Sequence, residues 1–180
     1  MQRRDFLILT LGAGASLMLP GGMAMGNVEV REFHPVTNRS WDLGPLERTP
    51  AFWRDHVSDA AWNILFRDGT ESPFSSPLDK LYADGTYVCA ACHLPLFSSD
   101  TKFDSRTGWP SFYLPFEGHL GTKVDRMLWI VRTEYHCVRC GGHQGHVFDD
   151  GPEPTGQRWC NNGLALRFVP ADEPLPQLRG

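Results

Sequence analysis

The sequence predicts a mainly β protein of short strands and few short helices. Eighteen glycines and fourteen prolines in 180 residues provide many turns, and six tryptophans provide aromatic contacts for a core. No long amphipathic helical repeat is visible, which also favours strands. With 41% apolar residues the chain can build a substantial core, and its length suits one domain with at most a small appendage.

The first 26 residues are expected to form an export signal. Arg3 and Arg4 precede an apolar run at 6–19, and small residues follow it, as in a signal peptide with its cleavage zone. The Arg-Arg pair before Asp-Phe-Leu resembles the bacterial twin-arginine signal, although glutamine precedes the pair where Ser or Thr is usual. We therefore expect a periplasmic protein after signal removal. The alternative is an N-terminal membrane anchor facing the periplasm, for which the run is short.

Residues 27–48 are polar and contain proline, so a linker or loosely packed arm is expected there. Thr49 can cap a helix, and Pro50 suits its first turn. Apolar residues then recur at helical spacing as far as Ile64, which predicts one helix with its inner face on the core. Trp53 and Trp62 are expected to pack in that core.

Short strands broken by Gly, Pro and Asp are predicted from Gly85 onward. The predicted strands are 86–88, 96–97, 112–113, 127–131, 135–136, 146–148 and 164–169. The runs at 127–131 and 164–169 have the strongest strand pattern. Residues 171–180 are rich in proline and are expected to fray as a tail.

Four cysteines form two Cys-x-x-Cys pairs, Cys89 with Cys92 and Cys137 with Cys140. Two such pairs brought together offer four thiolates in a tetrahedral arrangement, which suits a closed structural zinc site. Two disulfides in an oxidising compartment are a weaker alternative. A thioredoxin-type redox pair is another, but it would not explain why the motif occurs twice.

The fifth cysteine, Cys160, belongs to neither Cys-x-x-Cys pair. It could be an intermolecular partner, a buried passenger or a reactive thiol. Arg158 places a positive charge nearby, which favours the thiolate. If residues 158–162 are extended, Arg158, Cys160 and Asn162 point to one face. These neighbours favour a functional thiol.

Two further groups of residues are candidates for chemistry. His143 and His146 follow the second cysteine pair, and four thiolates would already saturate zinc, so both are available for acid–base work. Either histidine alone would more commonly be structural. The aromatic-rich run 107–112 could belong to the core, or it could form an apolar wall for a methyl or thioether group.

Together these runs resemble the methionine-R-sulfoxide reductases of the B type. The matching stretches are Gly69–Phe74, Tyr87–Cys92, Leu96–Ser105, Gly108–Phe112, Arg132–Glu134, Cys137–Phe148, Asp150–Pro152, Pro154–Gly156 and Arg158–Asn162. They are specific and cover residues 49–170, the expected reductase domain. The resemblance implies a compact β-barrel-like domain of short antiparallel strands, with a four-cysteine zinc site away from the catalytic thiol.

The resemblance also implies roles for individual residues. The implied nucleophile is Cys160, the groups that bind and protonate the sulfoxide oxygen are His143 and His146, the orienting and charge-stabilising groups are Asn162 and Arg158, and the apolar walls are Trp109 and Phe148. Attack of the Cys160 thiolate on the sulfoxide sulfur would release methionine and leave a sulfenic acid on the cysteine. The expected substrate is the R epimer in oxidised proteins or peptides, so the implied function is protein repair.

One departure from the family pattern concerns recycling. Many members carry a resolving cysteine where this chain has Thr107, and the four other cysteines are assigned to zinc. We therefore expect a one-cysteine enzyme that a small thiol or a thioredoxin-like partner reduces. A monomer is expected, and the net charge of −4 argues against nucleic acid as a partner.

Two other classes of function stay open on the sequence alone. A periplasmic zinc-ribbon binding module would have an unreactive Cys160. A general thiol oxidoreductase would need a redox-active Cys-x-x-Cys pair.

Overall fold

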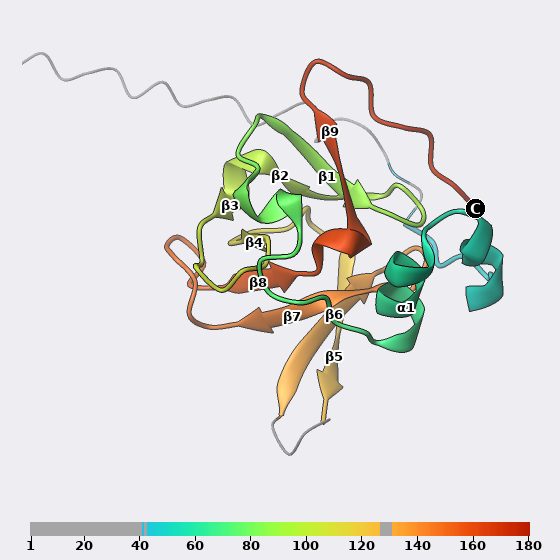
Figure 1. Ribbon diagram of the computed structural model, residues 1–180, viewed down its shortest axis with the longest axis horizontal. Helices are drawn as coiled ribbons and strands as arrows, with labels where there is room; N and C mark the ends of the chain where they lie inside the picture. The colour runs from blue at the N-terminus through green and yellow to red at the C-terminus, as the bar shows by residue number, and fades with distance from the viewer. Residues whose placement is uncertain (1–40, 42, 127–130) are drawn as a thin grey trace, which may run out of the picture. The chain divides into compact units, whose positions relative to one another are not determined.

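The computed structural model describes residue 41, residues 43–126 and residues 131–180, all of which lie within one compact unit that spans residues 34–180 (Figure 1). The predicted export signal and most of the predicted linker lie outside the described residues, as do residues 127–130 of the predicted strand 127–131. None of the described helices combines the length and the apolar character that a membrane span needs.

The described strands form two antiparallel sheets. The smaller sheet has the order β2-β1-β9 and the larger β3-β4-β8-β7-β6-β5. Their bounds are β1 Gly85–Cys89, β2 Pro95–Ser98, β3 Lys102–Phe103, β4 Ser111–Phe112, β5 Leu120–Asp125, β6 Arg132–Cys137, β7 His143–Phe148, β8 Arg158–Asn161 and β9 Leu166–Pro170. The prediction of a mainly antiparallel β fold is confirmed, and both sheets are open within the described part of the chain.

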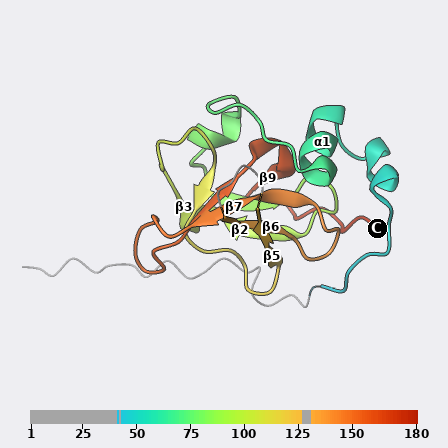
Figure 2. The same cartoon turned by 90° about the horizontal axis from the view of Figure 1, so that it is seen from below.

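The helices are short, as predicted. Within the described residues they are the α-helix α1 Asp59–Arg67 and the short 3₁₀-helices η2 Pro50–Asp55, η3 Pro77–Lys80, η4 Ser99–Thr101 and η6 Gly163–Ala165. Figure 2 shows α1 in the upper part of the view, above β9, β6 and β5. The predicted strand 164–169 begins two residues late, because its first two residues belong to the η6 turn, and it continues to Pro170.

The single helix predicted after Thr49 was wrong, because the chain forms η2 and α1 as separate elements. Thr49 stands at the start of η2, but its side chain accepts no capping hydrogen bond there. Ser58 is extended and its hydroxyl accepts from the Ala61 amide at 3.2 Å, so a new helix begins after it. Trp53 and Trp62 are both buried in the core, as predicted.

Aromatic rings join the two sheets across the core. Phe97 of β2 stacks on Phe112 of β4 with ring centroids 4.2 Å apart, and Tyr87 of β1 meets the same Phe112 edge-on at 4.9 Å. In the larger sheet, Tyr135 of β6 packs edge-on against Trp159 of β8 at 4.9 Å. Such rings bury large apolar areas and prefer these geometries, so Phe112 joins β4 to the smaller sheet, and the Tyr135–Trp159 pair braces β6 against β8 within the larger one.

The expectation that residues 171–180 fray was also wrong, because their last part is bonded to both cysteine turns. We call residues 177–180 the strap. The Arg179 amide donates to the Cys92 carbonyl at 3.0 Å, and its guanidinium donates to the His56 carbonyl at 3.0 Å. The Arg139 guanidinium in the second turn donates to the Arg179 carbonyl. These long-range backbone contacts hold the strap in place, and proline content alone could not reveal them.

Candidate active site and metal centre

The four paired cysteines meet at one point. Cys89 ends β1, Cys137 ends β6, and the four sulfurs all lie within 4.8 Å of one another. The Cys89–Cys140 and Cys92–Cys137 Sγ distances are 3.6 and 3.5 Å. A tetrahedral zinc thiolate with bonds of about 2.3 Å places its sulfurs about 3.8 Å apart, whereas a disulfide needs about 2.05 Å. All five cysteines are free, so the cluster fits a metal ion better than two disulfides.

Two glycines shape the second cysteine turn. Gly141 has φ +71°, a left-handed conformation that favours glycine. A Cβ at Gly142 would come within 3.3 Å of Cys140 Sγ and 2.9 Å of a Leu65 methyl group. The turn therefore needs small residues to bring its thiols toward the first pair.

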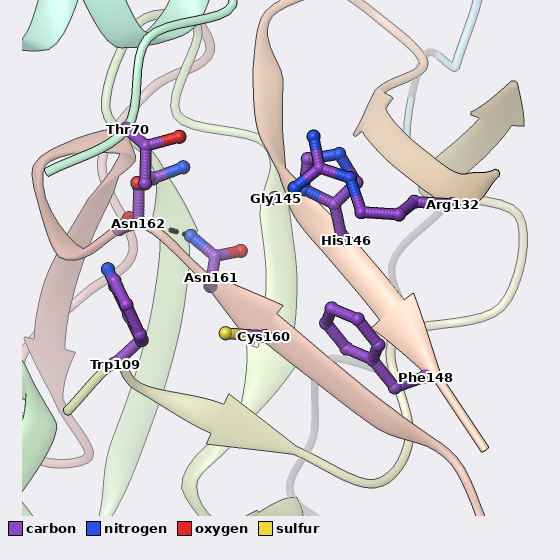
Figure 3. Close-up of a pocket in the computed structure, with 9 residues that line it drawn as sticks. All are labelled: Thr70, Trp109, Arg132, Gly145, His146, Phe148, Cys160, Asn161 and Asn162. Atoms are coloured by element: carbon purple, nitrogen blue, oxygen red, sulfur yellow. Dashed lines mark hydrogen bonds between the residues drawn. The ribbon is translucent and has the colours of Figure 1, made fainter. Parts of the chain in front are cut away.

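A cavity of about 120 Å³ lies beside the fifth cysteine (Figure 3). Nine residues line it: Thr70, Trp109, Arg132, Gly145, His146, Phe148, Cys160, Asn161 and Asn162. Five of the seven residues to which the sequence assigned catalytic or substrate-binding roles are therefore together in this cavity. The other two, His143 and Arg158, do not line it. The volume suits one side chain rather than a large ligand.

Strand pairing explains how the cavity residues meet. In the antiparallel β7–β8 pair, His146 lies directly opposite Cys160, and in the β4–β8 pair Ser111 lies opposite the same Cys160. Directly opposite residues project to the same face of a sheet, so His146 and Cys160 share one. A Cβ at Gly145 would come within 1.9 Å of the Cys160 carbonyl oxygen, so this approach of the two strands requires glycine. The expected extended conformation of residues 158–162 is confirmed, since β8 covers Arg158–Asn161 and the Asn162 backbone is also extended.

Trp109 and Phe148 lie on either side of Cys160 in Figure 3, as two apolar walls would. The indole nitrogen of Trp109 donates to the Glu71 carbonyl at 3.2 Å, which fixes the plane of the ring. The Glu71 amide in turn donates to the Asn162 side-chain oxygen at 3.1 Å. The loop that contains Thr70 and Glu71 is thus hydrogen-bonded both to Trp109 and to Asn162, two residues that line the cavity.

The groups around Cys160 have opposing effects on the pKa of its thiol. Burial raises the pKa of Cys160, and this effect exceeds the lowering by the nearby Arg158 charge and by the Thr107 hydroxyl, which hydrogen-bonds the sulfur. Arg158 also forms a bidentate pair with Asp150, at 2.7 and 2.9 Å, and stacks over the Phe148 ring. The Arg158 charge therefore lowers the pKa of Cys160, as expected. Burial raises this pKa by more, so the thiol is the favoured form at neutral pH.

His146 is held by a carboxylate. Its Nε2 lies 2.9 Å from Asp125 Oδ2, and an Arg132 guanidinium nitrogen lies 2.6 Å from the same oxygen. Burial lowers the pKa of His146 more than Asp125 raises it, and the neighbouring Arg132 charge lowers it further. The imidazole is therefore mostly neutral at pH 7 and can accept a proton.

His143 lies next to His146 but outside the cavity, and the centroids of the two rings are 5.5 Å apart. It is buried, and its Nδ1 lies 3.0 Å from Glu134 Oε1. It lines a neighbouring cavity with charged groups that include Asp68 and Lys123. Of the two predicted histidines, His146 is therefore the one beside the thiol.

Several site residues were not singled out from the sequence. Arg132, Thr70 and Asn161 lie in matching stretches of the family resemblance, which was the available signal, but no role was assigned to them. Asp125 belongs to none of those stretches. It reaches the site only through the pairing of β5 with β6, where it lies opposite Arg132.

Comparison with known proteins gives one consistent result. The SelR domain family matches residues 57–170. A Pseudomonas syringae protein named "Peptide methionine sulfoxide reductase MsrB" is 46% identical over 129 residues, which are 71% of this chain and 98% of that protein. A Leptospira interrogans protein of the same name is 49% identical over 64% of this chain and 89% of its own length. Another from Caulobacter vibrioides is 51% identical over 63% of this chain and 72% of its own length.

The raised pKa of Cys160 predicts a pH profile for its alkylation. Iodoacetamide should react with a half-maximal rate above the pH of an exposed cysteine, because a raised pKa keeps the thiol protonated to higher pH. Replacing Arg158 with Met should move this midpoint further upward, since the charge that stabilises the thiolate is removed. The matched change at the exposed Arg167 should leave the midpoint unchanged. A wild-type midpoint at or below that of free cysteine would contradict the prediction.

Proposed function

The chain belongs to the SelR-domain family of peptide methionine sulfoxide reductases, and we propose that it reduces the R epimer of protein-bound methionine sulfoxide with Cys160 as the nucleophile. It is an oxidoreductase that acts on sulfur and repairs oxidised methionine. These residue roles are supported by the position of the free Cys160 thiol. It lies in a cavity large enough for about one side chain, between the rings of Trp109 and Phe148, and Cys160 is paired across the strands with His146.

Each cavity wall suits one part of the sulfoxide. The methyl group fits against Trp109 and Phe148, because thioether-like groups make favourable contacts with aromatic rings. The partly negative oxygen fits the polar side, where Arg132 and His146 line the cavity. Fixed places for the methyl group, the oxygen and the attacking sulfur are what discrimination between the two epimers requires.

Proton transfer can be carried by His146. Because its pKa is lowered, the neutral imidazole can accept the proton of the Cys160 thiol, and the resulting thiolate attacks the sulfoxide sulfur. The imidazolium then returns the proton to the oxygen. The sulfur–sulfur bond made by the attack and the sulfur–oxygen bond of the substrate then break as the hydroxyl forms a bond to the Cys160 sulfur. Methionine leaves with a lone pair restored on its sulfur, and Cys160 carries the transferred oxygen and the proton as a sulfenic acid.

Arg132 and Asp125 support this transfer. The Arg132 charge lies where negative charge develops on the oxygen, which is the effective position for electrostatic stabilisation. Asp125 holds both Arg132 and His146 by one carboxylate oxygen, so it orients the acid and the cation together. Arg158 acts at the sulfur itself, where its charge favours the thiolate.

Recycling of the sulfenic acid is proposed to need an external thiol, either a small molecule or a thioredoxin-like protein. The chain has five cysteines, and four of them gather in the metal cluster. The hydroxyl of Thr107 occupies the place beside Cys160 Sγ. No second thiol of the chain therefore faces Cys160 from that side.

The metal is proposed to be zinc. Cys89, Cys92, Cys137 and Cys140 would hold it, and four thiolates around a closed tetrahedral site are typical of structural zinc. Bound zinc would tie the end of β1 to the end of β6 and so strengthen the join between the two sheets. All four ligand positions are filled by protein, so the metal is assigned no part in the reaction.

The compartment is proposed to be the periplasm, on the strength of the signal pattern in the first 26 residues. Twin-arginine substrates are generally exported folded, so zinc could load in the cytoplasm before transport. An uncleaved membrane anchor facing the periplasm is the second possibility.

The activity is tested with Cys160→Ser and separate R and S epimers of a methionine sulfoxide peptide, with dithiothreitol as reductant. We expect wild type to reduce the R epimer and the variant to lose on the order of a thousandfold or more, because a hydroxyl cannot replace the nucleophile. The S epimer is the internal control and should remain unreduced by both. Full activity in Cys160→Ser would instead favour a zinc-ribbon binding module.

The recycling proposal predicts the product of one turnover without reductant. Wild type treated with excess substrate should release one methionine per chain and gain one oxygen by mass spectrometry. Thr107→Cys is the matched variant, because it places a thiol beside Cys160 and should lose two hydrogens to an internal disulfide instead. An internal Cys160 disulfide in wild type would refute the proposal.

The metal proposal predicts about one zinc per chain in elemental analysis of the purified protein. Arg179→Ala should release zinc to a chelator several-fold faster than wild type, since it removes the guanidinium's contacts with the Ala90 and Ala91 carbonyls of the first cysteine turn. Arg167→Ala removes an exposed arginine elsewhere and should leave the release rate unchanged. Protein purified without chelator that carries no zinc would rule the proposal out.

The export proposal predicts a shortened chain in the periplasmic fraction of a bacterial host. Replacing Arg3 and Arg4 together by Lys should retain the full-length chain in the cytoplasm, because twin-arginine export depends on the pair. A full-length wild-type chain in the membrane fraction would point to the anchor, and one in the cytoplasm would remove the export proposal.

A further inference from the structure

A large aromatic side chain stays exposed beside the active-site cavity. Phe74 lies in the loop between α1 and η3, four residues after the cavity residue Thr70, and 66% of its surface is accessible to solvent. It is the first residue after Ser72-Pro73 in that loop. Single exposed apolar residues are common on protein surfaces, so the significance of this one depends on how it is held.

Phe74 is fixed to the segment that carries the Trp109 wall. Its amide donates to the Gly108 carbonyl at 2.7 Å, one residue before Trp109. Its ring packs so closely on Gly108 that a Cβ there would lie 2.9 Å from ring carbons. The Ser75 hydroxyl donates to the Ser72 carbonyl at 2.6 Å and closes the turn around it. The ring is therefore tied directly to the rim of the cavity.

The backbone of Phe74 is in a conformation that disfavours a bulky residue. Its φ is +62°, in the left-handed region that glycine and asparagine adopt most readily. Burial of the ring does not offset the cost of this backbone conformation, since most of the ring is in solvent. A strained residue that gains little in the free protein suggests a contact made only with a ligand.

The cavity and its substrate indicate what that ligand is. A cavity of about 120 Å³ admits the methionine sulfoxide side chain, so the residues on either side of it must lie over the rim. Methionine is among the most often buried residues, and its neighbours in a core are apolar. Oxidised methionine exposed by local unfolding therefore arrives with apolar residues close to it.

We propose that Phe74 is a docking residue for polypeptide substrates, and that its ring packs against a large apolar side chain adjacent to the methionine sulfoxide. The inference rests on the proposed function. It adds to that function a preference for polypeptides in which a large apolar residue adjoins the methionine sulfoxide. Phe74 takes no part in the chemistry; it adds binding energy at the rim of the cavity.

The experiment compares three substrates that share the R sulfoxide: N-acetyl-methionine sulfoxide, a pentapeptide with Gly on both sides of the sulfoxide, and one with Phe on both sides. For wild type we expect kcat/KM on the Phe-flanked peptide to exceed that on the Gly-flanked peptide by about five- to tenfold, the size of an added aromatic contact. The difference should lie mainly in KM, because the contact is made equally before and during reaction.

The decisive variant is Phe74→Asn, because asparagine tolerates the left-handed backbone but removes the ring. It should lose the preference for flanking Phe and keep wild-type activity on N-acetyl-methionine sulfoxide within about twofold. Phe74→Tyr should retain the preference. Tyr82→Asn is the matched control: Tyr82 is 50% exposed and lies outside the residues that line the cavity, so the preference should persist.

The outcomes separate the two proposals. An unchanged preference in Phe74→Asn would overturn the docking role, as would a wild-type enzyme with no preference. An equal loss on all three substrates would also overturn it, because that pattern means the ring merely supports Trp109. If wild type reduces none of the three, the proposed function itself fails.

Discussion

The buried side chain of Gln144 is where the metal cluster and the active site are joined. Its amide nitrogen donates to Cys89 Sγ at 3.5 Å, and its side-chain oxygen accepts from Asn161 at 3.5 Å. Its main-chain carbonyl accepts from the backbone and side-chain amides of Asn162, at 2.8 and 3.1 Å. Unpaired buried polar groups are costly, so the cysteine turns and the end of β8 that carries Cys160 are constrained to move together.

This constraint helps to keep the half-buried Cys160 thiol in place. Cys160 lies on an inner strand of the larger sheet, between β4 and β7, and the Phe97–Phe112 stack holds the neighbouring β4 against the smaller sheet. Groups held on strands keep their geometry better than groups on loops. Of the residues that line the cavity, Thr70, Trp109 and Asn162 lie outside the strands, and the Glu71 backbone links Trp109 to Asn162. The site therefore needs little rearrangement to receive a sulfoxide.

Local patterns in the sequence predicted the cysteine pairs and the surroundings of Cys160, because these depend on spacing within a few residues. The break between η2 and α1 was missed, since helical periodicity carries across it and Ser58 was not recognised as a cap. Asp125 could not be found, because only the pairing of β5 with β6 brings it to His146. The positions of His143 and His146 also needed the strand register, which sequence spacing does not specify.

The strap has a consequence for the order of events during synthesis. Arg179 follows Cys140, the last metal ligand, by 39 positions (179 − 140). At ribosomal rates the segment that braces the cysteine turns is made about 2 to 8 seconds after the turns themselves. For that interval the four thiols lack the contacts of Arg179 with Cys92 and Arg139. All four metal ligands are therefore synthesised before Arg179, whose backbone bonds to the first cysteine turn.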